Sequence, residues 1–490
     1  MSNTLTEPAA PPVPLPIRVE VTRDALADRV VLDGKALLIT AAMLLVTLLT
    51  QLLDLGESAL DTDFLVALSA LASSMFLVRA LYVRAERFLF SPSFWLVVTF
   101  LFYFVLKSLD LWSKDLVTPT LVEALWLGAL FLVTYVAVFA WQDARIRRQA
   151  ASPVGTLKET VIAPRASWAL LAVFAAFKLL GIALFASAGG GDVLEVSAAT
   201  QNAGAAYLYR IPTVGNIVFL ALLYDAFKHN RGWTAALLAL ALYLAEAVLS
   251  TSRLSLVLVV MWSAFLYHRY HSPISLWRVA LIGSPLVLVV VLFGYARNLE
   301  VGSAAAYMEA AGVLIEQPGL ISDLFLQRMD MLPELVTALD LQRAGVLPDL
   351  NGASYIYAFL HAVPRSLWEA KPLLTAALAT SETHPLAFAD GVNIFPSILF
   401  EGMANLSYAG VILSGALIAF LSRQLERAIE ADRLVPSVWA LSLLTFPMAL
   451  FNEGVHSNFT GNLLYITAMT ALLYQALKLV GLIQRRRSPA

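Results

Sequence analysis

The sequence predicts an all-α polytopic membrane protein with about twelve transmembrane helices and one large helical loop late in the chain. Of the 490 residues, 59% are apolar and 14% are charged, whereas a soluble domain has about 45–50% apolar and about 25% charged residues. Runs of about 20 apolar residues recur along the whole chain, and each run is long enough to cross a bilayer as a helix. These observations exclude a soluble enzyme with a single membrane anchor.

Composition excludes several other classes of protein. The formal net charge of −2 argues against a nucleic-acid binder, which needs an excess of cations. The apolar runs are continuous, whereas the strands of a β-barrel alternate in polarity. The chain contains no cysteine, so disulfides, thiolate nucleophiles, cysteine-bound zinc and iron–sulfur clusters are all excluded.

The chain begins with a polar, proline-rich segment, residues 1–34. This segment lacks the short apolar region and the small-residue cleavage site of a signal peptide, so a disordered cytoplasmic tail is expected here. Transmembrane helices 1–9 are expected over 35–296, a large loop over 297–393, helices 10–12 over 394–483 and a basic cytoplasmic tail over 484–490. The spans themselves are expected at 35–55, 64–83, 93–111, 118–141, 167–188, 211–227, 233–250, 254–268, 276–296, 395–422, 434–452 and 459–482.

The distribution of lysine and arginine between the loops predicts the orientation of the chain. One set of connections is rich in these cations and includes both termini, whereas the alternate set, such as 57–63 and 452–458, is short and acidic or neutral. The cation-rich connections contain Arg79, Arg84, Arg87, Arg145, Arg147, Arg148, Lys158, Arg165, Lys228, Arg231, Arg269, Arg278, Arg423, Arg427 and Arg433. Because cytoplasmic loops carry the excess of cations, both termini are expected in the cytoplasm and the large loop on the opposite side.

The loop over 297–393 is much longer than the other connections, and long loops in compact proteins are usually functional. A helix is expected to start at Glu334, because Pro333 suits the first helical turn. A second short helix is expected over 354–362, ended by Pro364. Amphipathic segments of this kind can lie on the membrane surface. A lid without chemistry is the alternative, although the loop carries the densest set of ionisable residues outside the cytoplasm.

Lys178, Glu246 and Lys107 are charged residues inside expected spans, where a charge costs about 2.5–3.5 kcal/mol on insertion scales and is a functional candidate. Lys178 lies near the middle of the fifth span, Glu246 in the outer half of the seventh and Lys107 near the outer end of the third. Lys178 and Glu246 either form a structural ion pair inside the bundle or line a path for a polar or anionic substrate that enters from the lipid.

Several cations are expected at the non-cytoplasmic face, which the orientation rule disfavours for them. They are Arg210, Arg253, Arg297, Arg365 and Lys371. Guanidinium groups bind phosphate oxygens through two parallel hydrogen bonds, while lysine acts as a point charge. The cluster therefore suits a lipid-linked phosphate or pyrophosphate, and the alternative for any one member is snorkelling to lipid headgroups.

Acids and imidazoles on the same face supply candidate general bases, since either group can accept a proton from a substrate hydroxyl within hydrogen-bond reach. They are Asp330, Glu334, His361, Glu369, Glu382, His384, Asp390 and Glu401. No HExxH, GxSxG, Walker A or Rossmann pattern occurs, and Asp61 and Asp63 have no further ligand nearby. No metal and no cofactor are therefore expected, and ATP-driven transport or kinase chemistry is unsupported.

Four short stretches, together with the overall plan, carry a family resemblance. They are Ser250-Thr251-Ser252-Arg253; Val363-Pro364-Arg365-Ser366-Leu367-Trp368 followed by Lys371-Pro372; Glu401-Gly402-Met403-Ala404-Asn405 with Gly410; and Arg328-Met329-Asp330. With many spans and one large outer loop, the chain resembles the Wzy-type O-antigen polymerases, also called oligosaccharide repeat-unit polymerases. The stretches look like that family's serine-rich turn with arginine, its Pro-Arg…Lys-Pro segment, its Glu–Asn–Gly stretch and its Arg-x-Asp position.

The resemblance implies a metal-independent glycosyltransferase with a GT-C-like helical membrane fold. Such enzymes join undecaprenyl-pyrophosphate-linked oligosaccharides at the periplasmic face of the bacterial inner membrane. The growing chain is the donor and the incoming lipid-linked repeat unit is the acceptor. The implied partners are this lipid-linked oligosaccharide, the lipid bilayer and a chain-length regulator, with no nucleic acid.

The resemblance also implies roles for the outer residues, because positioned cations stabilise the charge that develops on a pyrophosphate leaving group. The expected substrate-binding set is Arg253, Arg297, Arg365, Lys371, Arg210, Arg328 and Lys178. His361 is the first candidate for the base that takes the proton of the acceptor hydroxyl, and Glu401 is the second.

Two other functions stay open at this point. An O-antigen ligase shares the architecture and the donor, but transfers the glycan to the lipid A core. A transporter or flippase also has about twelve spans, and its substrate site is formed by matched broken helices in a repeat. Pro396 and Gly402 interrupt one span here, but no partner interruption and no internal repeat are evident in the first half of the chain.

Overall fold

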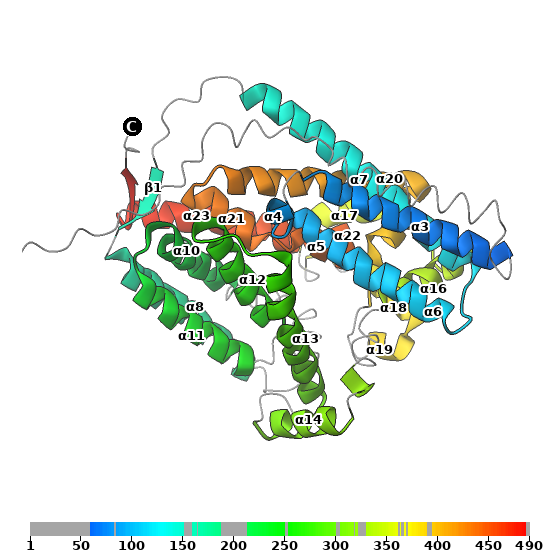
Figure 1. Ribbon diagram of the computed structural model, residues 1–490, viewed down its shortest axis with the longest axis horizontal. Coiled ribbons are helices and arrows are strands. Elements are labelled where there is room, and N and C mark those ends of the chain that lie inside the picture. Colours follow the sequence, from blue (N-terminus) through cyan, green and yellow to red (C-terminus); the bar gives the residue numbers. More distant parts are fainter. Residues whose placement is uncertain are drawn as a thin grey trace, which may run out of the picture.

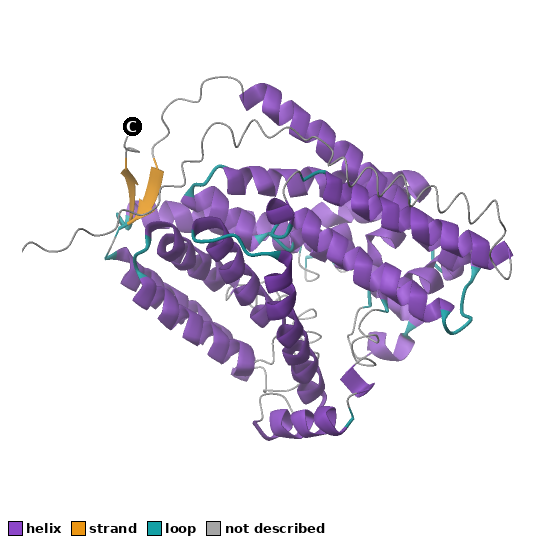
Figure 2. Cartoon of the chain, in the orientation of Figure 1, coloured by secondary structure: helices purple, strands orange, loops and turns teal. Residues whose placement is uncertain are grey.

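The computed structural model describes residues 59–82, 85–150, 159–163, 165–187, 213–249, 253–299, 304–317, 319–321, 330–360, 363, 367–368, 371–389 and 394–486. This part of the chain is almost entirely helical and contains one pair of short strands (Figures 1 and 2). The expected tail over 1–34 and the expected first span at 35–55 lie outside the described residues. Each of the other eleven expected spans overlaps a described helix or run of helices. That all of them cross a membrane stays a prediction.

Five described segments are long and apolar enough to cross a membrane, which is compatible with a membrane protein. They are Ala59–Ala80, Pro92–Trp112, Pro119–Ile146, Ser397–Glu430 and Leu434–Asn452. Large apolar side chains also remain exposed on the outside of the helices, including Trp277 at 75%, Leu179 at 64% and Leu237 at 54%. Such an apolar exterior suits contact with lipid rather than with water.

The first helical group combines elements from the start and the end of the described chain around one long helix, Pro119–Ala150. Its elements are α3 (Ala59–Ala80), α4 (Ala85–Phe88), α5 (Pro92–Phe100), the π-helix η1 (Leu101–Leu106), α6 (Lys107–Trp112) and α7 (Pro119–Ala150). From the end of the chain come α20 (Ser397–Glu430), α21 (Leu434–Ser442), α22 (Phe446–Asn458), the π-helix η3 (Phe459–Leu464) and α23 (Tyr465–Leu479). Helix α7 packs along both α3 and α20.

Buried aromatic rings fill the centre of this group. Phe451 of α22 meets Phe100, Phe131 and Phe104 at centroid distances of 4.6, 5.4 and 5.8 Å. All four rings are fully buried. Tilted and edge-on ring pairs at these distances stabilise a core beyond the burial of their area. The cluster therefore joins the two ends of the sequence into one body.

A second helical group follows in the middle of the chain. It contains α8 (Ala166–Ser187), α10 (Thr213–His229), α11 (Trp233–Leu249), α12 (Arg253–Tyr270), α13 (Leu276–Leu299) and α14 (Ala304–Glu316). Helix α10 packs against α8, α11 and α12, and also against α21 of the first group. Its Phe219 lies 5.1 Å from Tyr243 and 6.3 Å from Trp262 between ring centroids. The two groups are thus joined through α10 (Figure 1).

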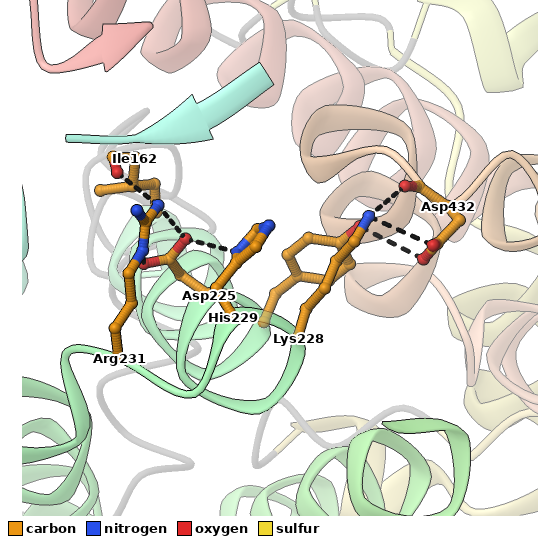
Figure 3. A network of polar contacts seen from close by, with 7 residues as sticks. Ile162, Asp225, Lys228, His229, Arg231 and Asp432 are labelled. Carbon is orange, nitrogen blue, oxygen red and sulfur yellow. Dashed lines mark hydrogen bonds and ion pairs between the residues drawn. The ribbon is translucent and has the colours of Figure 1, made fainter. Parts of the chain in front are cut away.

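Polar contacts tie the two groups together at one end of the bundle (Figure 3). Lys228 donates to the Asp432 carbonyl oxygen at 2.6 Å and pairs with its carboxylate at 3.2 Å. Asp225 accepts from Arg231 at 2.9 and 3.0 Å and contacts His229 Nδ1 at 2.9 Å. Arg231 also donates to the Ile162 carbonyl oxygen at 2.6 Å.

Ile162 ends strand β1 (Glu159–Ile162), which pairs antiparallel with β2 (Ile483–Arg486). No pattern in the sequence predicted this small sheet, and β2 includes residues at the start of the expected basic tail. The segments that contain Lys228, Arg231, Asp432 and the two strands are all expected on the cytoplasmic side. They meet at one end of the bundle (Figure 1).

Besides α14, the large loop expected over 297–393 folds into further helices, which lie away from the β1–β2 pair (Figure 1). They are α16 (Met331–Arg343), α17 (Ala353–Leu360), α18 (Thr375–Thr383) and α19 (Pro385–Ala389). The helix expected from Glu334 is therefore present and begins three residues earlier, at Met331. The helix expected over 354–362 is also present. Both predictions depended on proline and amphipathic spacing, which locate a helix more reliably than its ends.

Candidate functional site

Helix α16 is fixed to the first turns of α6 and α7 by polar and charged contacts. Lys107, 8% exposed, pairs with Asp330 at 2.9 Å, just before α16 begins. Thr120 donates to Asp340 at 2.6 Å and accepts from Arg343 at 2.9 Å. Arg343 also forms an ion pair with Glu123. The large loop is therefore bound to the helical bundle, and Lys107, which the sequence marked as an intramembrane charge, is one of the residues that bind it.

The first part of α20 is bent sharply, which brings its two sides together. Leu406 (φ −142°, ψ 23°) and Ser407 (φ 54°, ψ −143°) leave the helical conformation. A Cβ added at Gly402 would lie 2.8 Å from Gly410 C, so no side chain fits between these two glycines. The sequence placed the interruption at Pro396 and Gly402. The structure places it at Leu406 and Ser407, with Gly402 at the contact that the bend creates.

A buried carboxylate holds this bend in place. Glu401 is 0% exposed, and its Oε1 accepts from Ser354 Oγ of α17 at 2.7 Å. Its Oε2 accepts from Val455 N of α22 at 2.6 Å, next to Gly454, which breaks that helix with φ 77°. Asn405 donates to Ser354 Oγ and to the Glu401 carbonyl oxygen, both at 2.7 Å. We call these residues, Glu401, Ser354, Asn405 and Val455, the Glu401 node.

The Glu401 node joins three elements: the loop helix α17 and the bends of α20 and α22. A further bond from Leu350 N to the Ala404 carbonyl oxygen at 2.7 Å reinforces it. Beside the node, burial raises the pKa of Tyr355 to about 12, and the Glu401 charge adds to this rise. Tyr355 therefore stays neutral at neutral pH. Because both Glu401 carboxylate oxygens already accept hydrogen bonds, the geometry favours a positioning role over that of a base.

The segment that carries the Pro-Arg…Lys-Pro resemblance follows α17. Lys371 Nζ donates to the Val363 carbonyl oxygen at 3.0 Å, which closes the chain between these two residues. Trp368 lies 6.1 Å from Tyr357 of α17 between ring centroids. The predicted site residues His361 and Arg365 lie outside the described residues. Of this segment, the structure therefore places Lys371 near α17.

Arg253 and Arg297 come from neighbouring helix ends. Arg253 begins α12, and Arg297 lies two residues before the end of α13. Leu256 and Phe293, one turn away from each arginine, belong to one buried cluster. The structure therefore brings these two backbone positions to the same end of the second helical group, while the side chains of both arginines lie outside the described residues. Arg210 and Arg328, also predicted substrate-binding residues, lie outside them entirely.

Lys178 forms an ion pair with Glu246, which was one of the two alternatives expected from the sequence. Its Nζ donates to Glu246 Oε2 at 2.6 Å and to Asn216 Oδ1 at 3.1 Å, and it lies 4.2 Å from the centroid of the Tyr243 ring. The Lys178 side chain is 7% exposed and that of Glu246 is 20% exposed. A charge this buried is matched by a carboxylate, an amide and an aromatic face, which accounts for it without a substrate.

The pair gives a stability prediction. Glu246→Ala should lower the free energy of unfolding by about 3 kcal/mol, because it leaves the buried Lys178 cation without its carboxylate. The double variant Lys178→Met, Glu246→Leu should recover to within about 1 kcal/mol, because apolar residues can replace a buried pair. Thermal unfolding of the three proteins in detergent measures this. If the double variant unfolded as easily as Glu246→Ala, the unpaired cation would not be the cause of the loss of stability.

Within the described residues, no group of three or more His, Asp or Glu side chains could hold a metal ion. Comparison with protein-family models, with curated proteins and with solved structures finds no match for this chain. The functional conclusion therefore depends on the chain's own residues and on the geometry above.

Ser354 and Val455 were missed by sequence reasoning, although Glu401, Asn405 and Gly410 of the same site were marked together by their motif.

Proposed function

We propose that this protein polymerises undecaprenyl-pyrophosphate-linked oligosaccharide repeat units at the periplasmic face of the bacterial inner membrane. In this proposal the chain has a GT-C-like fold with twelve transmembrane helices, and both termini are cytoplasmic. The large loop then lies in the periplasm, at the end of the bundle opposite the contacts of Figure 3.

One observation carries the proposal: two stretches of the family resemblance lie on either side of Ser354. On one side, Ser354 Oγ donates to Glu401 at 2.7 Å. On the other side, Ser354 and Pro372 line the same cavity. Residues far apart in the sequence, with no shared apolar pattern, are thus placed around one side chain. This arrangement supports a common site formed by the loop and the broken helix α20.

The proposed reaction is a direct displacement at the anomeric carbon of the donor sugar. A hydroxyl oxygen of the acceptor forms the new glycosidic bond, and the carbon–oxygen bond to the pyrophosphate breaks. The pyrophosphate leaves with the electron pair, and its charge is stabilised by Arg253, Arg297 and Arg365 with Lys371. His361 takes the proton of the acceptor hydroxyl. Glu401 acts through the Glu401 node, because it orients α17 and the segment that follows it.

The first experiment is an electrophoretic profile of surface polysaccharide from a strain that lacks the gene. Loss of the long ladder, with a single repeat unit on the lipid A core, is the result expected for a polymerase. A lipid A core without any repeat unit, together with accumulated lipid-linked polymer, would instead identify a ligase. An unchanged ladder would contradict both functions for that polysaccharide and leave a transporter of another glycan.

A further inference from the structure

A chain of buried hydroxyl groups ends at a carboxyl group near the last turn of α20. Tyr82, which follows α3, donates to Glu426 Oε1. The Tyr82 hydroxyl also contacts Ser93 Oγ of α5 at 2.6 Å, and Ser93 Oγ contacts the Tyr135 hydroxyl of α7 at 2.6 Å. All three hydroxyl-bearing side chains are buried, and the Glu426 side chain is 13% exposed. The chain therefore connects α20 to α3, α5 and α7 away from water.

The guanidinium that faces Glu426 is shared with other carboxylates. Arg423 Nε donates to Asp143 Oδ1 at 3.0 Å, and Arg423 Nη1 donates to Glu430 Oε2 at 3.1 Å. The distance from Arg423 Nη1 to Glu426 Oε2 is 3.9 Å. Among the described residues of this cluster, the carboxyl groups thus outnumber the guanidinium, and Glu426 has the longest contact with it.

Burial and negative neighbours both disfavour a charge on Glu426. A buried carboxyl group loses the hydration that stabilises its ionised form, and a carboxylate nearby destabilises that form further. Asp143 is also buried, but it accepts from two nitrogens of Arg423. The Glu430 side chain is 49% exposed and keeps its contact with water. Glu426 has neither a short ion pair nor this exposure, so it is the acid of the cluster that a proton neutralises most readily.

The hydroxyl chain suits either protonation state of Glu426, because each hydroxyl can both donate and accept. When Glu426 is ionised, every hydroxyl donates toward the carboxylate and Tyr82 is the last donor. When Glu426 is protonated, the direction reverses, and Tyr135 donates at the other end of the chain. Ser422 lies buried beside Tyr135, and its Oγ makes no hydrogen bond within the described residues. Ser422 Oγ therefore supplies the acceptor that the reversed chain needs.

The charged and titratable groups around Glu426 come from each of the helices packed there. They are Arg79 and Tyr82 at the end of α3, Tyr135 and Asp143 of α7, and Arg423 and Glu430 of α20 itself. Arg79 donates to the Tyr82 carbonyl oxygen, and both tyrosines are protonated at neutral pH. Helix α5 contributes Ser93, which does not titrate. Glu426 is therefore the group through which the charge of this buried cluster changes near neutral pH.

We propose that Glu426 binds a proton at neutral pH and that the bound proton holds the end of α20 against α3, α5 and α7. Release of the proton leaves a buried negative charge beside Asp143 and Glu430, which favours opening of this end of the bundle. Helix α20 carries the Glu401 node near its other end, so the proton helps to fix the helix on which that node depends. This inference goes beyond the proposed function and does not depend on it.

Infrared difference spectroscopy of the purified full-length protein in phospholipid nanodiscs tests for the proton. The carbonyl stretch of a protonated carboxyl group is separate in frequency from the bands of carboxylates and amides. A band of this kind is expected at neutral pH and should disappear as the pH is raised. Glu426→Gln should lose the band at every pH. Glu430→Gln, which changes a half-exposed acid bonded to the same Arg423, is the control and should keep it.

Hydrogen exchange over 422–430 tests whether the proton holds the end of α20. An opened end exposes Glu426 to water, where a glutamate ionises with a pKa of about 4.3. From that pH up to the pH at which the folded protein releases its proton, opening should become about tenfold more favourable per pH unit. The wild type and Glu430→Gln should show this loss of protection. Glu426→Gln should keep its protection constant, because glutamine has no proton to lose.

Two outcomes would overturn the proposal. If no carboxyl band at neutral pH depends on Glu426, this residue is ionised and its charge is balanced by Arg423 and Tyr82. If protection over 422–430 falls with pH in Glu426→Gln as it does in the wild type, the proton does not hold the end of α20.

Tyr82→Phe gives a second variant in case Glu426→Gln does not fold. It keeps the carboxyl group but removes its hydrogen-bond partner, so the frequency of the band should shift. An unshifted band would assign the proton to another residue and overturn the proposal. These measurements do not use the polysaccharide, so the ladder experiment decides the proposed function separately.

Discussion

An Arg253→Ala, Arg365→Ala double variant should accumulate in the membrane at the wild-type level and leave the surface polysaccharide without long chains. The physical reason is the leaving group, because the negative charge on the pyrophosphate grows as its bond to the anomeric carbon breaks. Removal of one positioned donor from such a site lowers the rate by about 10²–10³-fold. Electrophoresis of surface polysaccharide, with immunoblotting of membranes for the protein, measures both quantities in the same cells.

Arg365→Lys separates hydrogen-bond geometry from charge. Lysine keeps the positive charge but lacks the planar fork that binds two phosphate oxygens in parallel. The single lysine variant should therefore remain impaired, with chains shorter than those of the wild type. If Arg365→Lys restored the full ladder, the residue would act as a point charge, as expected for a cation near lipid headgroups.

Arg278→Ala is the matched control for these arginine variants. Arg278 is an exposed arginine at the start of α13, on the side expected to be cytoplasmic. Its loss should leave the ladder unchanged, because it lies far along α13 from Arg297. Full-length polymer from the double alanine variant would remove Arg253 and Arg365 from the proposed mechanism, whatever the control shows.

Helix positions could be read from the sequence because each span depends on a local property. A run of about 20 apolar residues forms a helix in a membrane whatever its neighbours are, since its backbone must satisfy its own hydrogen bonds there. Charge pairs between spans were less predictable. Lys178 and Glu246 were marked as partners by their depth, but the aromatic face of Tyr243 beside Lys178 depends on packing between α8 and α11.

The breaks in the helices were not predictable in the same way. Leu406 and Ser407 are neither glycine nor proline, which are the usual signals of a helix break. Their conformation is fixed by contacts elsewhere, namely the Gly402–Gly410 approach and the bond from Leu350 N to the Ala404 carbonyl oxygen. The strand pair β1–β2 was missed for a similar reason, because a four-residue strand has almost no pattern of its own.

Gly410→Ala should be the most damaging single-methyl change among the glycines of α20. An added Cβ at Gly410 would overlap the Gly402 carbonyl oxygen and lie 2.7 and 2.9 Å from Gly402 C and Cα. These are backbone atoms of the same bend, so no flexible side chain can move aside. Overpacking of this kind costs about 1–3 kcal/mol, and more where the backbone must shift. The yield of folded protein and its melting temperature in detergent should both fall.

Gly312→Ala is the control for that variant. Gly312 lies inside α14, where an added Cβ meets nothing within 4 Å, and alanine favours a helix over glycine by about 1 kcal/mol. Its melting temperature should stay equal or rise. Hydrogen exchange then locates the damage in Gly410→Ala: faster exchange is expected over α17 and the Val455 amide, because both are bound to α20 through Glu401. If Gly410→Ala melted like the wild type, the close approach of Gly402 and Gly410 would not be what holds the node together, and the positioning role of Glu401 would lose its structural basis.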